Sequence, residues 1–138
     1  MKKVLSIEQM KHLQELGLDT SDASMYWARV SHGSRVDDKS KGKWFLSLHK
    51  EFQTCGFMSY ESIPTYTLQD ILGKLPCFIG NQVLTIQKLA DSYTCLYMNP
   101  YTRFFINITE GKELIDAVYD MLCWCIEKRI VKVGMEEK

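Results

Sequence analysis

Residues 109–129, TEGKELIDAVYDMLCWCIEKR, form the longest segment of the chain in which apolar residues recur at helical spacing. The residues that step by three and four, and so share one side of an α-helix, are Leu114, Ala117, Val118, Met121, Leu122, Cys125 and Ile126. Ile115, Tyr119 and Trp124 widen that side to an arc of roughly 220°. Because a helix on a single layer needs a narrower apolar face, we expect this segment to be the central packing element. The residues expected to face water are Glu113, Asp116, Asp120, Cys123 and Glu127.

The composition is that of one ordinary globular domain. The chain has 138 residues, of which 46% are hydrophobic and 25% charged, values typical of a folded protein. Lysine plus arginine equals aspartate plus glutamate at 17 each, so no overall charge attracts a polyanion or a membrane surface. We therefore expect a single domain over residues 1–138.

The cysteines and the N-terminal residues indicate a cytoplasmic protein. Five cysteines are an odd number and include no CxxC pair, which argues against a secreted disulfide scaffold. The apolar stretch after Lys3 is too short for a signal peptide. No apolar run approaches the roughly 20 residues of a membrane span, so we expect no membrane partner.

Two short helices are predicted by their capping residues. Ser6 and Gln9 match a capping box, and Gly17 is a helix stop signal. Thr67 caps the second helix with Asp70 at the third helical position, and Pro76 ends it.

A β-hairpin is predicted between these helices. Residues 25–30 (MYWARV) have the composition of a strand, residues 31–43 are nearly all polar and form a loop, and residues 44–49 (WFLSLH) suit a return strand. A helix over residues 45–55 is the alternative, because apolar residues recur there at helical spacing as well.

Three strands are predicted before the last helix, over residues 83–88, 93–98 and 103–108, with hairpin-sized connections. In the last strand Phe104, Ile106 and Ile108 point to one side, and we expect one covered and one partly wet face. The element order predicts an α+β fold. Its antiparallel sheet, a hairpin plus a three-stranded meander, carries about three helices on one face.

Enzyme chemistry has no positive signal in the sequence. His12, His32 and His49 are scattered singly, without the spacing of metal ligands. The phosphate-binding, dinucleotide, nucleophile-elbow and zinc-protease motifs are all missing. We therefore predict a protein that is not an enzyme and has no catalytic residue, metal site or cofactor.

The basic stretch over residues 29–43 is a candidate nucleic-acid contact. Basic residues near aromatic rings can grip phosphates and stack bases. The candidate residues are Trp27, Arg29, Arg35, Lys39, Lys41, Lys43 and Trp44. A solvated hairpin loop with tryptophans in the core at its base is the alternative, since such loops are commonly polar.

Tyr119 and Trp124 are candidate protein contacts, because they border the apolar arc of the last helix and aromatic rims suit an interface. Burial of both residues beneath the first helix and the proline-led segment is the alternative.

Three stretches carry a resemblance to a known group of proteins. The first spans residues 6–21, the second reads IPTYTLQDIL over residues 63–72, and the third, residues 114–127, has MLCWCI at its centre. They resemble small uncharacterised proteins encoded in prophage-like or mobile-element regions of gut bacteria. The thirteen-residue loop at 31–43 departs from the short turn of that group. The resemblance implies one cytoplasmic domain and transfers no site residue.

Together these observations favour a small binding or adaptor domain that acts through protein–protein contact and forms a homodimer. A nucleic-acid-binding accessory protein that uses residues 29–43 is the alternative.

Overall fold

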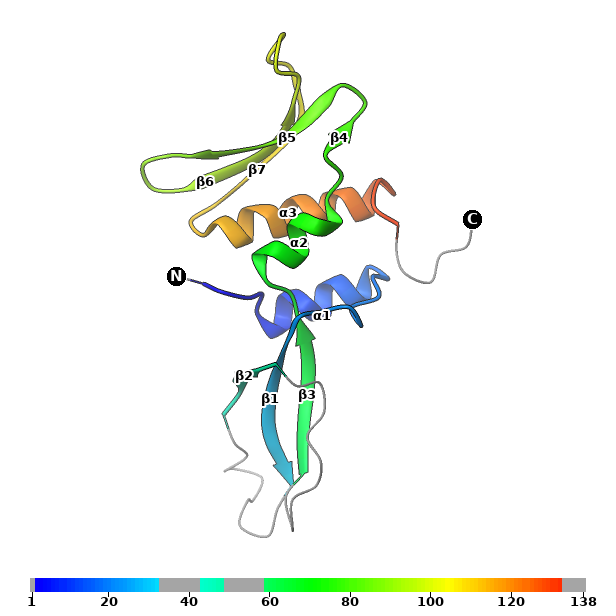
Figure 1. Cartoon of the computed structure of the whole chain (residues 1–138), viewed down its shortest axis with the longest axis vertical. Helices are drawn as coiled ribbons and strands as arrows, with labels where there is room; N and C mark the ends of the chain where they lie inside the picture. The colour runs from blue at the N-terminus through cyan, green and yellow to red at the C-terminus, as the bar shows by residue number, and fades with distance from the viewer. Residues whose placement is uncertain (1, 33–42, 49–58, 133–138) are drawn as a thin grey trace.

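The computed structural model describes residues 2–32, 43–48 and 59–132. A three-stranded sheet lies at one end of an elongated molecule, three helices lie in the middle, and a four-stranded sheet lies at the other end (Figure 1). The α+β class with antiparallel strands is confirmed. The hairpin and the meander, however, belong to two separate sheets rather than one.

Helix α1 (Ile7–Glu15) forms as its capping box predicts. The Ser6 side chain accepts a hydrogen bond from the Gln9 amide, and the Gln9 side chain accepts one from the Ser6 amide. Gly17 takes a positive φ of 99°, and the Leu18 amide then donates to the Leu13 carbonyl, which stops the helix.

Strands β1 (Met25–His32), β2 (Phe45–Ser47) and β3 (Ser59–Thr65) form the three-stranded sheet in the order β2-β1-β3. The return strand is confirmed over residues 45–47; most of the alternative helix lies outside the described residues. Strand β3 was not predicted, because Pro64 disfavours a strand that is bonded on both sides. Proline is tolerated here since β3 is an edge strand.

Helix α2 (Leu68–Lys74) has the predicted Thr67–Asp70 capping box. Strands β4 (Phe78–Ile79), β5 (Gln82–Lys88), β6 (Tyr93–Met98) and β7 (Phe105–Gly111) then follow in chain order across the second sheet. The strand predicted at residues 103–108 is shifted toward the C-terminus. The shift arises because Arg103, at a φ of 68°, still belongs to the turn.

Helix α3 (Leu114–Glu127) is the central packing element, as predicted. Val118 and Leu122 are fully buried, in a core cluster to which α1, α2 and β6 also contribute. The helix begins later than residue 109, because Thr109, Glu110 and Gly111 belong to β7. Among the described residues, no helix combines the length and apolar character needed to cross a membrane.

Candidate functional site

The face of the four-stranded sheet that points away from α3 is the main candidate site. Cys95 and Tyr97 of β6 lie in the core cluster with α3, so their neighbour Leu96 points to the opposite side. Residues paired across antiparallel strands share a face. Leu96 pairs with Thr85 and Ile108, which places both on that opposite side. We call this side the outer sheet face; pairing assigns to it Phe78, Val83, Thr85, Leu96, Met98, Phe105 and Ile108. The bulge residue Ile106, two positions before Ile108, is counted with them.

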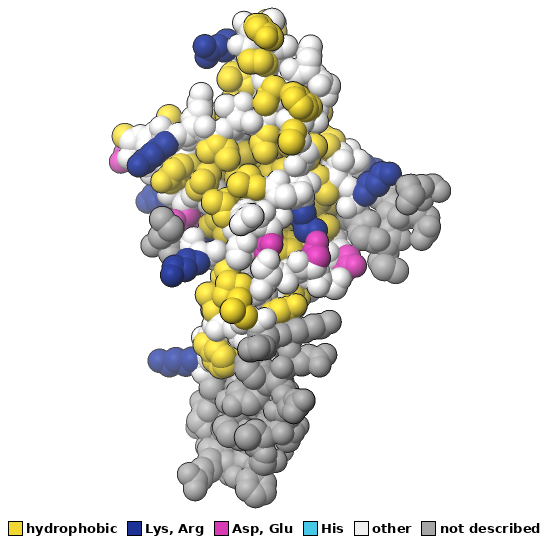
Figure 2. Space-filling view, viewed as in Figure 1, with side chains coloured by type: hydrophobic (Ala, Val, Ile, Leu, Met, Phe, Trp, Pro, Cys, Tyr) yellow, Lys and Arg dark blue, Asp and Glu magenta, His cyan; other side chains and the backbone are white. Residues whose placement is uncertain are grey.

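The outer sheet face is apolar and exposed at its margins. Leu96 at the centre is buried, with 4% of its surface exposed, yet it lies outside the core cluster. Around it, Phe78 is 63% exposed, and Ile106 and Ile108 are each 45% exposed. Figure 2 shows apolar side chains crowded over the half of the molecule that holds this sheet. None of the described helices covers the face.

The tip of the β6–β7 hairpin extends this apolar surface. Tyr101 and Phe104 are 91% and 74% exposed, and Phe105 at the start of β7 is 54% exposed. The tip is held in place by Asn99, whose side chain accepts hydrogen bonds from the Tyr101 and Thr102 amides. The aromatic rings therefore stand on an ordered turn beside β7.

The sequence predicted one covered face for the last strand without assigning it, and Asn107 and Thr109 lie on that face. Phe104, Ile106 and Ile108 are exposed, and α3 packs against Asn107 and Thr109. The Thr109 hydroxyl donates to the Ala117 carbonyl at 2.7 Å, and the Asn107 amide approaches the Met121 sulfur at 3.5 Å. Polar side chains face the helix because each finds a hydrogen-bond acceptor there. Hydrophobic alternation does not reveal such partners.

Tyr119 is buried, with 8% of its surface exposed, so it cannot serve as an exposed partner contact. Burial raises the pKa of its hydroxyl, and its proximity to Cys123 adds to that rise. For this residue the burial alternative is correct. Trp124 is half-buried against the core cluster, and its role as a partner contact stays a prediction.

Three of the candidate nucleic-acid residues are engaged within the chain. Arg29 lies 3.4 Å from Glu61 and stacks its guanidinium 4.5 Å from the ring centre of Trp44. Trp27 donates its indole N–H to the Leu5 carbonyl at 2.9 Å. Lys43 is exposed. Arg35, Lys39 and Lys41 lie outside the described residues. The nucleic-acid hypothesis therefore stays a prediction, with part of its residues already paired.

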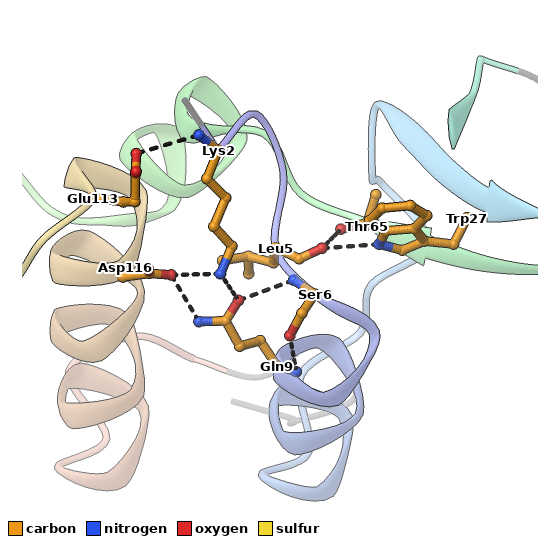
Figure 3. Close-up of polar contacts among 8 residues, drawn as sticks. All are labelled: Lys2, Leu5, Ser6, Gln9, Trp27, Thr65, Glu113 and Asp116. Atoms are coloured by element: carbon orange, nitrogen blue, oxygen red, sulfur yellow. Dashed lines mark hydrogen bonds and ion pairs between the residues drawn. The ribbon is translucent and has the colours of Figure 1, made fainter. Parts of the chain in front are cut away.

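The acidic strip of α3 is partly covered by the N-terminal segment (Figure 3). The Lys2 ammonium lies 2.7 Å from Asp116 and 2.8 Å from the Gln9 side-chain oxygen, and the Lys2 amide donates to Glu113. Asp116 is thus half-buried rather than solvated as predicted. Its Oδ1 atom accepts hydrogen bonds from both the Lys2 ammonium and the Gln9 amide.

A polar hollow is lined by residues of α2 and of the loop before β1, and these residues are also paired with one another. Lys74 lies 2.6 Å from Asp22, and the Ser24 hydroxyl donates to Asp70 at 2.6 Å. These short contacts leave the lining groups without an unpaired nucleophile or base. The hollow therefore has the features of a structural polar cluster.

The two fully buried cysteines, Cys95 and Cys125, are unreactive in this setting. Burial raises the pKa of Cys95 to about 12 and that of Cys125 to about 11, so neither thiol ionises near neutral pH. Within the described ranges no group of three or more His, Cys, Asp or Glu residues could hold a metal ion.

Comparison of the chain with protein-family models, with curated proteins and with solved structures gives no match. The resemblance to prophage-encoded proteins therefore stays a prediction.

Proposed function

We propose that this protein is a non-enzymatic binding or adaptor domain that acts through protein–protein contact and docks its partner on the outer sheet face. The observation that carries the proposal is the exposed apolar margin of that face, Phe78 on one side and Ile106 and Ile108 on the other.

The size of the exposed apolar surface supports a docking role. Each buried aromatic side chain covers about 150–250 Å². Applied to the exposed fractions of Phe78, Tyr101, Phe104 and Phe105, this gives roughly 550 Å² of aromatic surface before the isoleucines are counted. The largest apolar patch of an ordinary monomer measures about 300–600 Å² and is often functional. This surface reaches the upper end of that range.

The pairing of the polar groups also supports docking on the outer sheet face. Asp116 of α3 is paired with Lys2. Near the hollow, Asp22 is paired with Lys74, and Asp70 accepts a hydrogen bond from the Ser24 hydroxyl. Interfaces are depleted of charge at their centre and enriched in aromatic residues, and the outer sheet face has that composition. The apolar sheet, rather than a polar cluster, therefore offers the free surface.

A photo-crosslinking residue placed at position 108 tests the proposal. We expect a defined covalent adduct with a protein, whether another copy of this chain or a different one. We expect no such adduct from the same residue at Lys11, an exposed position on α1. Phe78→Ser should remove most of the adduct, because it deletes an anchor of the same face.

Leu89→Ser is the matched control, since Leu89 is an exposed leucine outside the outer sheet face. It should leave the adduct unchanged. Equal adducts at positions 108 and 11, or an adduct that survives Phe78→Ser, would contradict the proposal.

A further inference from the structure

The middle of the free edge of β7 carries no charged residue and no proline. Among the described residues β7 pairs only with β6, so its other edge presents unpaired backbone groups. Natural sheets protect such edges with charged residues or proline. Between Phe104 and Thr109 the strand has neither.

Among the other described edge strands, β2 and β4 are only three and two residues long, which itself limits pairing. Strand β3 has Glu61 and Pro64. Strand β5 is covered by β4 at its start and ends with Gln87 and Lys88. In the described part of the chain, β7 is therefore the long edge strand whose middle residues include neither a charge nor a proline, and it is also the strand with the most exposed apolar side chains.

Two unpaired charges of opposite sign lie at the two ends of this edge. Arg103 is exposed just before β7 and Glu110 is exposed near its end. Neither forms an ion pair with the described part of the chain, although Glu110 accepts a hydrogen bond from Ser92. If a second β7 pairs antiparallel around a point near Asn107, each Arg103 comes beside the Glu110 of the other strand.

We infer that the occupant of this edge is a second copy of the same chain, which pairs β7 with β7 in antiparallel orientation about a two-fold axis near Asn107. A two-fold contact uses one patch twice, and this edge is complementary to itself in charge and in apolar character. The four-stranded sheets then join into one continuous sheet of eight strands. This inference rests on the proposed function and places a second copy at the β7 edge, which borders the outer sheet face.

The available surface is sufficient for such a dimer. Phe104, Phe105, Ile106 and Ile108 expose on the order of 400 Å² of apolar side chain per copy, from the areas of buried side chains. Tyr101 and the backbone of the paired strands add to this. A standard interface buries about 800 Å² per partner, so the β7 edge and the hairpin tip together approach that size.

The experiment measures the mass of the purified full chain by sedimentation equilibrium from about 1 μM to about 100 μM, a range that brackets micromolar affinity. We expect a concentration-dependent shift from 16.1 kDa to twice that mass. Arg103→Glu alone and Glu110→Arg alone should each raise the dimer dissociation constant about tenfold. In either variant, residues 103 and 110 of the two copies carry charges of the same sign and meet twice, once on each side of the two-fold axis. The double variant should return the dissociation constant to the wild-type value.

Lys88→Glu is the control. It makes the same change of charge as Arg103→Glu, but on β5, away from the β7 edge. It should leave the dissociation constant unchanged. Amide hydrogen exchange gives an independent readout: residues 105–109 should become protected as the concentration rises, whereas the amides of β1 should not.

A monomer throughout this range would overturn the inference, as would a dimer in which the double variant is not restored or in which β7 gains no protection. The proposed function fails separately. A monomer that still crosslinks to a different protein from position 108 keeps the docking surface and excludes the second copy. The absence of any adduct removes both.

Discussion

The carboxylate of Asp116 fastens the N-terminal segment to α3 through the Lys2 ammonium and the Gln9 side chain. Burial raises its pKa, but the hydrogen bonds from Lys2 and Gln9 outweigh this effect, so the pKa lies below its usual value. Gln9 in turn accepts a hydrogen bond from the Ser6 amide that begins α1. One residue of α3 is therefore linked to the cap of another helix (Figure 3).

We predict that Asp116→Asn lowers the free energy of unfolding by about 0.5–1 kcal/mol at pH 7, because the ion pair is partly exposed. Since the folded pKa is depressed, the stabilisation is complete above the unfolded pKa of 3.8. It is lost as the pH falls below that value through the folded pKa. Urea unfolding of both proteins at pH 7 and near pH 3 measures this. A difference that stays constant or grows toward acid pH would contradict the role of the charged carboxylate.

At the scale of elements, the close junction of β7 and α3 depends on Gly111. A Cβ atom at this position would lie 3.0 Å from the Ala117 nitrogen and 3.1 Å from the Glu113 oxygen. Both are backbone atoms, which cannot move aside as a flexible side chain can. With a larger residue at position 111, the end of β7 could not lie as close to the first turn of α3 as it does now.

We predict that Gly111→Ala lowers the free energy of unfolding by about 1–3 kcal/mol through this overcrowding. Gly73→Ala is the matched control, since Gly73 lies in α2 with no atom within 4 Å of an added Cβ. It should raise stability by up to about 1 kcal/mol through helix propensity and a restricted unfolded chain. Thermal and urea unfolding of the pair test this. Equal effects of the two substitutions would remove the steric explanation.

The elements that the sequence predicted are those specified by local chemistry. Capping residues set α1 and α2, and the width of the apolar arc identified α3 as the centre of the core. Strand β3 was missed because its pairing with β1 is not visible in its own residues. The division into two sheets was missed for the same reason.

The candidate site was missed because strand alternation gives two faces without saying which one is covered. In β7 a bulge at Ile106 shifts the register, and α3 accepts a hydrogen bond from Thr109. The apolar alternation of this strand therefore left open which of its residues face outward. The signal that was available is Gly111, because a glycine between a strand and a helix indicates a close approach of the two.

At the scale of the whole molecule, the two sheets differ in how they join the core. The four-stranded sheet contributes Cys95 and Tyr97 directly to the core cluster. The three-stranded sheet is attached through fewer groups. At its base the Leu5 carbonyl accepts hydrogen bonds from Trp27 and from the Thr65 hydroxyl, at 2.9 and 2.8 Å (Figure 3).

This difference predicts two levels of opening within one folded chain. Amides of β6 and α3 should exchange with solvent only on global unfolding, whereas amides of β1 should exchange through a smaller opening of lower free energy. Trp27→Phe deletes the indole hydrogen bond to Leu5 and keeps an aromatic ring. It should lower the opening free energy of β1 by about 1 kcal/mol and leave the difference between β1 and α3 larger than in the wild type. Native-state hydrogen exchange in low denaturant measures both values in one sample. If β1 and α3 exchange with the same free energy and fall together in Trp27→Phe, the three-stranded sheet belongs to the same cooperative unit as the core. The hydrogen bonds to the Leu5 carbonyl would then belong to the core, and would not join a less stable sheet to a more stable one.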